Sequence, residues 1–139
     1  MLNRRRRLEV FAVDTWAGSP EHAETSEVIH GTLFEEFKRN MRPVESAFTA
    51  IRSTSVEAAS RFEDGSIDAV FIDAGHEYED VVADLEAWYP KVRRHGYLCG
   101  HDYSIAWPGV IRAVDEFFST RPGEIISRGD EYCWVSRKL

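Results

Sequence analysis

The stretch that decides the fold spans residues 67–76 and reads IDAVFIDAGH. Its first six residues are almost entirely apolar, which is typical of a buried β-strand. The strand is followed at once by a carboxylate, Asp73, and three residues later by His76. A helix should come next, because four large apolar residues recur at helical spacing: Val81, Leu85, Trp88 and Val92. A strand followed by an amphipathic helix predicts a parallel βαβ unit.

The same alternation continues in both directions along the chain. Further strands are predicted at residues 8–13, 46–51 and 96–100, and further helices at 32–41, at 55–62 and from Pro108 onward. Two strand-like runs, 124–128 and 131–136, flank Gly129-Asp130 and predict a closing β-hairpin. The polar stretch 15–31 is typical of a functional loop. We therefore expect residues 1–139 to form one α/β domain, a parallel sheet with helices on both faces.

Composition narrows the range of functions. The chain has 139 residues and a net charge of −7, which argues against a general binder of nucleic acid or of anionic membranes. We interpret the basic run 4–7 as a solvated terminus. No apolar run reaches the ~20 residues that a bilayer-spanning helix needs. Cys99 and Cys133 lack metal-ligand spacing and are expected to be small buried hydrophobes. A soluble protein in the reducing cytoplasm is the default expectation.

Three of the predicted strands end in an aspartate, namely Asp14, Asp73 and Asp102. Ligands of open α/β sheets bind at the carboxyl ends of the strands, so these side chains are expected along one rim. The alternative is that each aspartate only caps a turn, which is a common role. Paired carboxylates suit Mg²⁺. A neighbouring histidine such as His76 can serve as a general base, although a capping or packing role for His76 is equally open.

Two motifs carry a resemblance to a known family. They are FIDAGHEYEDV at 71–81 and GYLCGHDY at 96–103, and VDTWAG at 13–18 agrees with them. Over about residues 8–135, the chain resembles class I S-adenosylmethionine-dependent methyltransferases. The group includes macrolide-sugar O-methyltransferases and cephalosporin-hydroxylase-like proteins. The resemblance implies a Rossmann-like sheet. It also implies metal-assisted methylation of a hydroxyl on a small polar or sugar-like acceptor.

The resemblance also implies which residues bind the methyl donor. By position, Asp14 would accept hydrogen bonds from the ribose hydroxyls of S-adenosylmethionine. Ser53 and Ser55 would lie near its adenine, and Asp73 would border the same site. For Ser55 a simple N-cap of the helix that begins there is an equal alternative.

A cation site and a base follow from the same resemblance. Asp73 and Asp102 would be ligands of a divalent cation, by implication Mg²⁺, and His76 would be the base. Related enzymes offer a further carboxylate or amide beside the second aspartate. Here its neighbours are His101 and Tyr103. We assign His101 to the metal site, while the third ligand and the metal stay open.

Several loop aromatics have two open interpretations. Trp16, His22, Tyr103 and Trp107 could line the acceptor pocket, or they could anchor their loops on the body of the domain.

The family's first strand and glycine-rich turn have no counterpart, because nothing like G-x-G-x-G occurs between Met1 and Leu8. That strand would lie between those that end at Asp14 and Asp73. We therefore expect a truncated domain. It should bind the donor only with an upstream extension, or when a partner chain or a second copy supplies the strand.

Three hypotheses follow for the function. The first is an active methyltransferase, and the second is a non-catalytic methyltransferase-like module. The third is a metal-dependent hydrolase that uses the same aspartates, although the sequence offers it neither a nucleophile elbow nor a phosphate loop.

Overall fold

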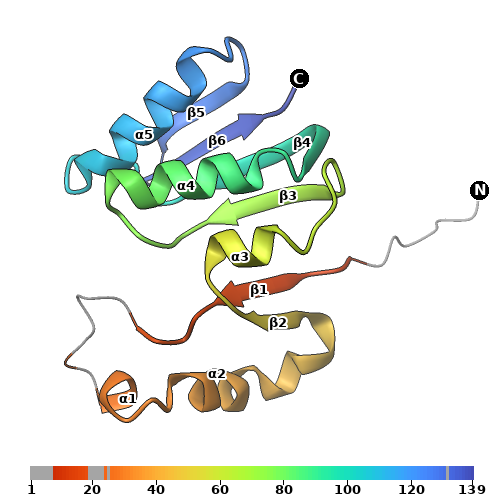
Figure 1. Ribbon diagram of the computed structural model, residues 1–139, viewed down its shortest axis with the longest axis vertical. Coiled ribbons are helices and arrows are strands. Elements are labelled where there is room, and N and C mark those ends of the chain that lie inside the picture. The colour runs from red at the N-terminus through yellow and green to blue at the C-terminus, as the bar shows by residue number, and fades with distance from the viewer. Residues whose placement is uncertain (1–7, 19–23, 25, 131) are drawn as a thin grey trace, which may run out of the picture. The chain divides into compact units, whose positions relative to one another are not determined.

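The computed structural model describes residues 8–18, 24, 26–130 and 132–139. It divides into two compact units, Met1–Thr54 and Ser55–Leu139 (Figure 1). The basic run 4–7 and His22 lie outside the described residues. Among the helices that are described, none combines the length and the apolar character needed to cross a membrane.

The first unit contains a two-stranded parallel sheet. Strand β1 (Phe11–Asp14) pairs with β2 (Thr49–Arg52), with Val13 opposite Ile51. Between the strands lie α1 (Ser26–Ile29), α2 (Leu33–Met41) and a 3₁₀ segment, η2 (Arg42–Ala47).

Aromatic packing holds the first unit together. Trp16 is only 5% exposed. Its ring centroid lies 4.6 Å from that of Phe34 and 4.7 Å from that of Phe37. Phe37 in turn contacts Phe48, which directly precedes β2. The loop after β1 is therefore anchored on α2 through Trp16.

The second unit is built on a four-stranded mixed sheet in the order β3-β4-β6-β5. These strands are β3 (Ile67–Ile72), β4 (Val92–Gly100), β5 (Ile125–Asp130) and β6 (Cys133–Arg137). Strands β3 and β4 are parallel, and β6 runs antiparallel to both β4 and β5. The helices are α3 (Ser55–Ala59), α4 (Tyr78–Trp88) and α5 (Pro108–Ser119).

Helices α4 and α5 lie side by side against one face of this sheet (Figure 1). The fully buried side chains include Leu85 of α4, Val114 of α5, Leu98 of β4 and Trp134 of β6. Residues that point to the opposite face are more open, and Phe71 of β3 is 58% exposed. Within the described part of the chain, β3 is the end strand of the sheet and pairs with β4 alone.

Most predicted elements are present with shifted ends. The helix predicted from Pro108 and the strand 67–72 occur as expected. The assignment of Val92 to a helix was wrong, because α4 ends at Trp88 and Val92 begins β4. Pro90 explains the difference, since proline cannot continue a helix. A single domain over residues 1–139 stays a prediction.

Candidate functional site

The second unit brings two strand ends together at one edge. In the parallel pair β3–β4, Ile72 lies opposite Gly100, and the His101 amide donates to the Ile72 carbonyl at 3.0 Å. A Cβ on Gly100 would lie 2.7 Å from that carbonyl oxygen and 2.8 Å from the Trp134 ring. Only glycine fits here, and the residues that follow, Asp73 on one strand and His101 on the other, therefore emerge side by side.

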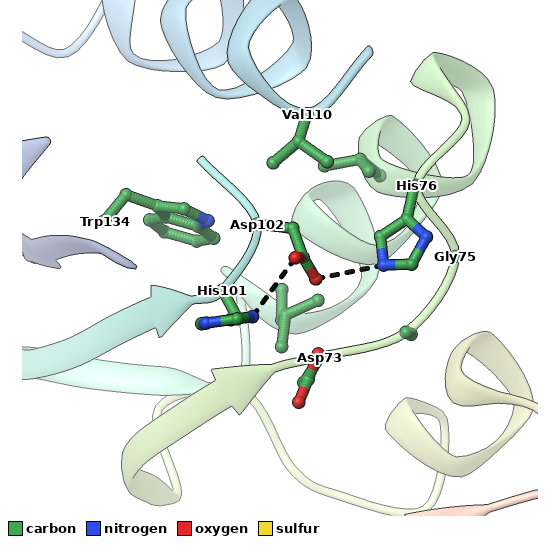
Figure 2. Close-up of a pocket in the computed structure, with 10 residues that line it drawn as sticks. Asp73, Gly75, His76, His101, Asp102, Val110 and Trp134 are labelled. Atoms are coloured by element: carbon green, nitrogen blue, oxygen red, sulfur yellow. Dashed lines mark hydrogen bonds and ion pairs between the residues drawn. The ribbon is translucent and has the colours of Figure 1, made fainter. Parts of the chain in front are cut away.

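Asp102 is the centre of this edge. Its Oδ2 lies 2.9 Å from His76 Nε2 and its Oδ1 lies 3.2 Å from His101 Nδ1. Figure 2 shows the carboxylate between the two imidazole rings. The side chains of Asp102 and His76 are about one-fifth exposed, so their interaction is partly shielded from water. Asp102 has a φ of +61°, a left-handed conformation that aspartate and asparagine tolerate better than most residues.

His76 is held from a second side by the start of α5. Its ring stacks on Trp107, with centroids 4.0 Å apart and planes 23° apart. A Cβ on Gly109 would lie 2.7 Å from the His76 carbonyl oxygen and 2.8 Å from the Tyr78 amide. The missing side chain at Gly109 therefore lets the first turn of α5 rest directly on the loop that carries the histidine.

Three side chains at this edge have the chemistry of a cation site. Asp73, His101 and Asp102 each offer a ligand atom, and the three atoms lie within 4.8 Å of one another. They line a small pocket together with His76 and Trp134 (Figure 2). Two carboxylate oxygens and an imidazole nitrogen are suitable ligands for a divalent metal.

The first unit places two of the predicted donor-binding residues together. Asp14 Oδ1 accepts a hydrogen bond from the Trp16 amide at 2.8 Å. The Asp14 carbonyl accepts one from the Ser53 amide at 3.0 Å. Asp14 therefore shapes the turn after β1, as the capping interpretation predicts, and Ser53 lies beside it.

Ser55 begins α3 in the second unit, and its hydroxyl is used in packing. Its Oγ accepts a hydrogen bond from Trp88 Nε1 at 2.8 Å. The same hydroxyl also hydrogen bonds with the buried carboxyl of Asp84. Burial raises the pKa of Asp84, and the bond to Ser55 partly opposes that shift.

The loop aromatics differ in role. Trp16 anchors its loop on α2. The Tyr103 hydroxyl donates a hydrogen bond to Asp115 at 2.9 Å, and burial raises the pKa of Tyr103. Trp107 lies at the site itself, on His76. Sequence reasoning missed this stack and the contact of Gly109, because both partners lie about thirty residues away in the chain. The only signal was the helix start at Pro108-Gly109, which places Trp107 at the sheet edge.

Comparisons with known proteins identify relatives of this chain. The profile of a family described as a methyltransferase domain matches residues 1–103. The uncharacterized protein y4gI of Sinorhizobium fredii (strain NBRC 101917 / NGR234) is 36% identical over 101 residues, which make up 70% of this chain and 10% of that protein. The chain thus spans about a tenth of the length of that relative.

Solved structures share the fold. The O-methyltransferase NovP superposes with a TM-score of 0.69 at 21% identity, over 94% of this chain and 60% of that one. CalS11, a TDP-rhamnose 3'-O-methyltransferase of calicheamicin biosynthesis, gives 0.56 at 17% identity, over 93% of this chain and 57% of that one. MycE, a methyltransferase of the mycinamycin pathway solved with Mg, SAH and mycinamycin VI, gives 0.56 at 16% identity, over 97% and 46%.

At these identities the structural likeness establishes the Rossmann-like α/β methyltransferase fold. The profile match covers most of the chain and includes the Asp14, Asp73 and Asp102 strand ends. The chain therefore belongs to the family of methyltransferase domains.

Proposed function

We propose that this domain transfers a methyl group from S-adenosylmethionine to a hydroxyl of a small polar or sugar-like acceptor, with a divalent cation at the β3–β4 edge. The proposal rests above all on one arrangement. In a methyltransferase domain, Asp73, His101 and Asp102 offer ligand atoms within 4.8 Å of one another, and His76 is bonded to Asp102.

The cation would be held by Asp73, His101 and Asp102. When bound, it would supply Lewis-acid polarisation of the acceptor hydroxyl. The donor set fits such an ion, since it offers two anionic oxygens and one nitrogen at a partly open edge.

His76 would take the proton that the acceptor hydroxyl loses. The bond between the donor sulfur and the methyl carbon breaks as the bond to the acceptor oxygen forms, and S-adenosylhomocysteine leaves. The Asp102 carboxylate, 2.9 Å from Nε2, would stabilise the imidazolium that results. The stack on Trp107 fixes the ring plane, so that little orientational freedom remains to be lost in the reaction.

The donor would be bound in part by the first unit. With Oδ1 of Asp14 accepting the Trp16 amide, Oδ2 would accept a ribose hydroxyl. Ser53, tied to Asp14 through its backbone, would lie near the adenine. Ser55 and Asp73 complete the proposed set, although the Ser55 hydroxyl already bonds to Trp88 and Asp84.

The proposed acceptor class follows from the relatives. CalS11 is a TDP-rhamnose 3'-O-methyltransferase, and MycE was solved with mycinamycin VI. A glycoside or nucleotide sugar with a free secondary hydroxyl is therefore the first class to assay. A reducing, cytoplasmic setting is also part of the proposal.

A strand from another chain, either a partner or a second copy, is part of the proposal. Residues 69–72 of β3 are apolar on both faces, which is typical of an interior strand. Within the described residues, however, β3 ends the sheet and Phe71 is largely exposed. A parallel strand added to β3 would satisfy its open edge. Donor binding should then strengthen as the protein concentration rises, and equally tight binding by the monomer would contradict this part.

The test is product formation. We expect the chain, incubated with S-adenosylmethionine, a divalent cation and TDP-rhamnose or related glycosides, to release S-adenosylhomocysteine and a methylated sugar, measured by mass spectrometry. His76→Asn should slow this reaction by about 10²- to 10⁴-fold, and Asp73→Asn should abolish the cation-dependent turnover. The matched control is Asp68→Asn, because Asp68 is exposed and pairs with Arg93 at the surface.

The alternative is a non-catalytic methyltransferase-like module. It would follow if calorimetry showed no donor binding at any protein concentration and no glycoside were methylated. Donor binding with an unchanged rate in His76→Asn would instead remove the base from the proposal and leave the transferase.

A further inference from the structure

We propose that the cation site is selective for a first-row transition ion such as Mn²⁺ over Mg²⁺, with His101 as the ligand that sets this preference. The inference rests on the proposed function, because it concerns the identity of the cation in that site. It changes the expectation of Mg²⁺ that the resemblance implies.

The spacing of His101 and Asp102 fits two neighbouring ligands of one ion. Their Nδ1 and Oδ1 atoms are 3.2 Å apart. Ligands at about 2.1 Å from an ion, on adjacent corners of its coordination shell, lie about 3.0 to 3.4 Å from each other. The two atoms therefore need almost no movement to share a cation.

Asp73 completes the set from the neighbouring strand. All three ligand atoms fall within 4.8 Å of one another. Opposite corners of an octahedral shell are about 4.2 Å apart, so the exposed Asp73 side chain needs to move by only some tenths of an ångström. The backbone beneath it is fixed, because the His101 amide is bonded to the Ile72 carbonyl.

His76 limits how Asp102 can bind. The Nε2 atom of His76 is within hydrogen-bond distance of Oδ2 of Asp102, the oxygen that does not face His101. Asp102 can therefore offer only Oδ1, as a single-oxygen ligand, and His76 acts as the hydrogen-bonded outer partner that orients it. The protein then supplies two oxygens and one nitrogen, and the remaining positions are left to water and acceptor.

This ligand set decides the metal. Mg²⁺ prefers oxygen ligands and near-ideal octahedral geometry, whereas imidazole nitrogen suits transition ions such as Fe²⁺, Ni²⁺ and Zn²⁺. Mn²⁺ binds carboxylate oxygen as Mg²⁺ does, but as a first-row transition ion it also accepts an imidazole. A carboxylate at position 101 would give an all-oxygen site that suits Mg²⁺. The histidine at this position therefore shifts the preference toward the transition ions.

The experiment compares metal affinities with and without the imidazole. We expect calorimetry to show that the chain binds Mn²⁺ at least about 100-fold more tightly than Mg²⁺. In His101→Glu the ratio should fall by about tenfold or more, and His101→Gln should lower it in the same direction. Circular dichroism establishes that both variants are folded. His95→Asn is the matched control, since His95 is exposed, lies away from the site in β4, and has a φ of +63° that asparagine tolerates.

A second measurement reads the ligand directly. Electron spin echo modulation of the Mn²⁺-loaded chain should show one coordinated imidazole nitrogen, which persists in His95→Asn and is lost in His101→Gln. If both ions bind but the Mn²⁺ to Mg²⁺ ratio is the same in the wild type and in His101→Glu, with no nitrogen coupling, the inference is overturned while the proposed cation site stands. If neither ion binds, both are overturned.

Discussion

Asp14 and Asp102 follow the same sequence pattern, an apolar strand with an aspartate at its carboxyl end, but their surroundings differ. Asp14 is held by its own turn, through the Trp16 amide. Asp102 is held by two imidazoles, one from the next residue upstream and one from the loop after β3. The pattern alone therefore does not separate a turn cap from a reactive site. The difference arises from the residues that follow the neighbouring strand. The loop after β3 places His76 beside Asp102, whereas the contact of Asp14 comes from its own turn.

The largest expected effect on the rate is that of replacing Asp102, which contacts both His76 and His101. We expect Asp102→Asn to lower the rate of methyl transfer by about 10³-fold or more, because the amide neither balances an imidazolium nor binds a cation strongly. Asparagine tolerates the φ of +61°, so the thermal unfolding midpoint should change little. Initial rates and thermal melts of the two proteins test this. A rate within tenfold of the wild type would reduce Asp102 to a turn cap like Asp14.

The second test shifts the position of His76 and leaves its side chain unchanged. Gly109→Ala places a Cβ against the His76 carbonyl and the Tyr78 amide, so the loop must shift. We expect a rate loss of about 10²-fold and a destabilisation of about 1 to 3 kcal/mol.

Gly31→Ala is its control. Gly31 has a positive φ, of +66°, and open space around it, so the variant should lose only about 1 kcal/mol of stability and none of the rate. Equal losses of rate in both variants would mean that Gly109 acts through global stability. Rates and urea unfolding of the pair separate these outcomes.

The third test asks whether Asp14 does more than cap. Asp14→Asn keeps an Oδ1 that accepts the Trp16 amide, so the turn should persist. If the second oxygen binds the ribose, loss of the charge should weaken S-adenosylmethionine binding about tenfold. Calorimetry measures the change in Kd. An unchanged Kd would assign Asp14 to the turn alone.

The smallest expected effect is on stability and concerns Asp84, which takes no part in the proposed reaction. Burial raises the pKa of Asp84, so the folded chain holds this proton more tightly than the unfolded chain. The free energy of unfolding therefore falls as pH rises above the ordinary value of 3.8 and through the raised pKa.

Asp84→Asn should remove that loss. We expect a gain below about 2 kcal/mol at neutral pH that disappears near pH ~3, because the amide oxygen still accepts the Ser55 hydroxyl. Urea unfolding across this pH range measures the difference. A variant that is less stable at every pH would contradict the assignment, and the rate of methyl transfer should not change in any case.

The sequence predicted the elements better than the contacts. Strand 67–72 and the helix from Pro108 were evident because hydrophobic period and turn residues are local signals. The meeting of Asp73, His76, His101 and Asp102 was foreseeable once β3 and β4 were taken as parallel neighbours.

Other features depend on packing that no local pattern encodes. The stack of Trp107 on His76 and the close approach of Gly109 arise because the start of α5 packs against the loop that carries His76. Ser55 illustrates the opposite case. A serine at a helix start predicts a cap, but the Ser55 hydroxyl instead accepts a hydrogen bond from Trp88 of the next helix.

The single carboxylate of Asp102 serves both histidines, one through each oxygen. Substitutions at positions 76, 101 and 102 should therefore be epistatic, since a change in one alters what the others can do. A natural variant that loses Asp102 gains nothing from retaining either imidazole. The three positions should drift together once the constraint on any one of them is lifted.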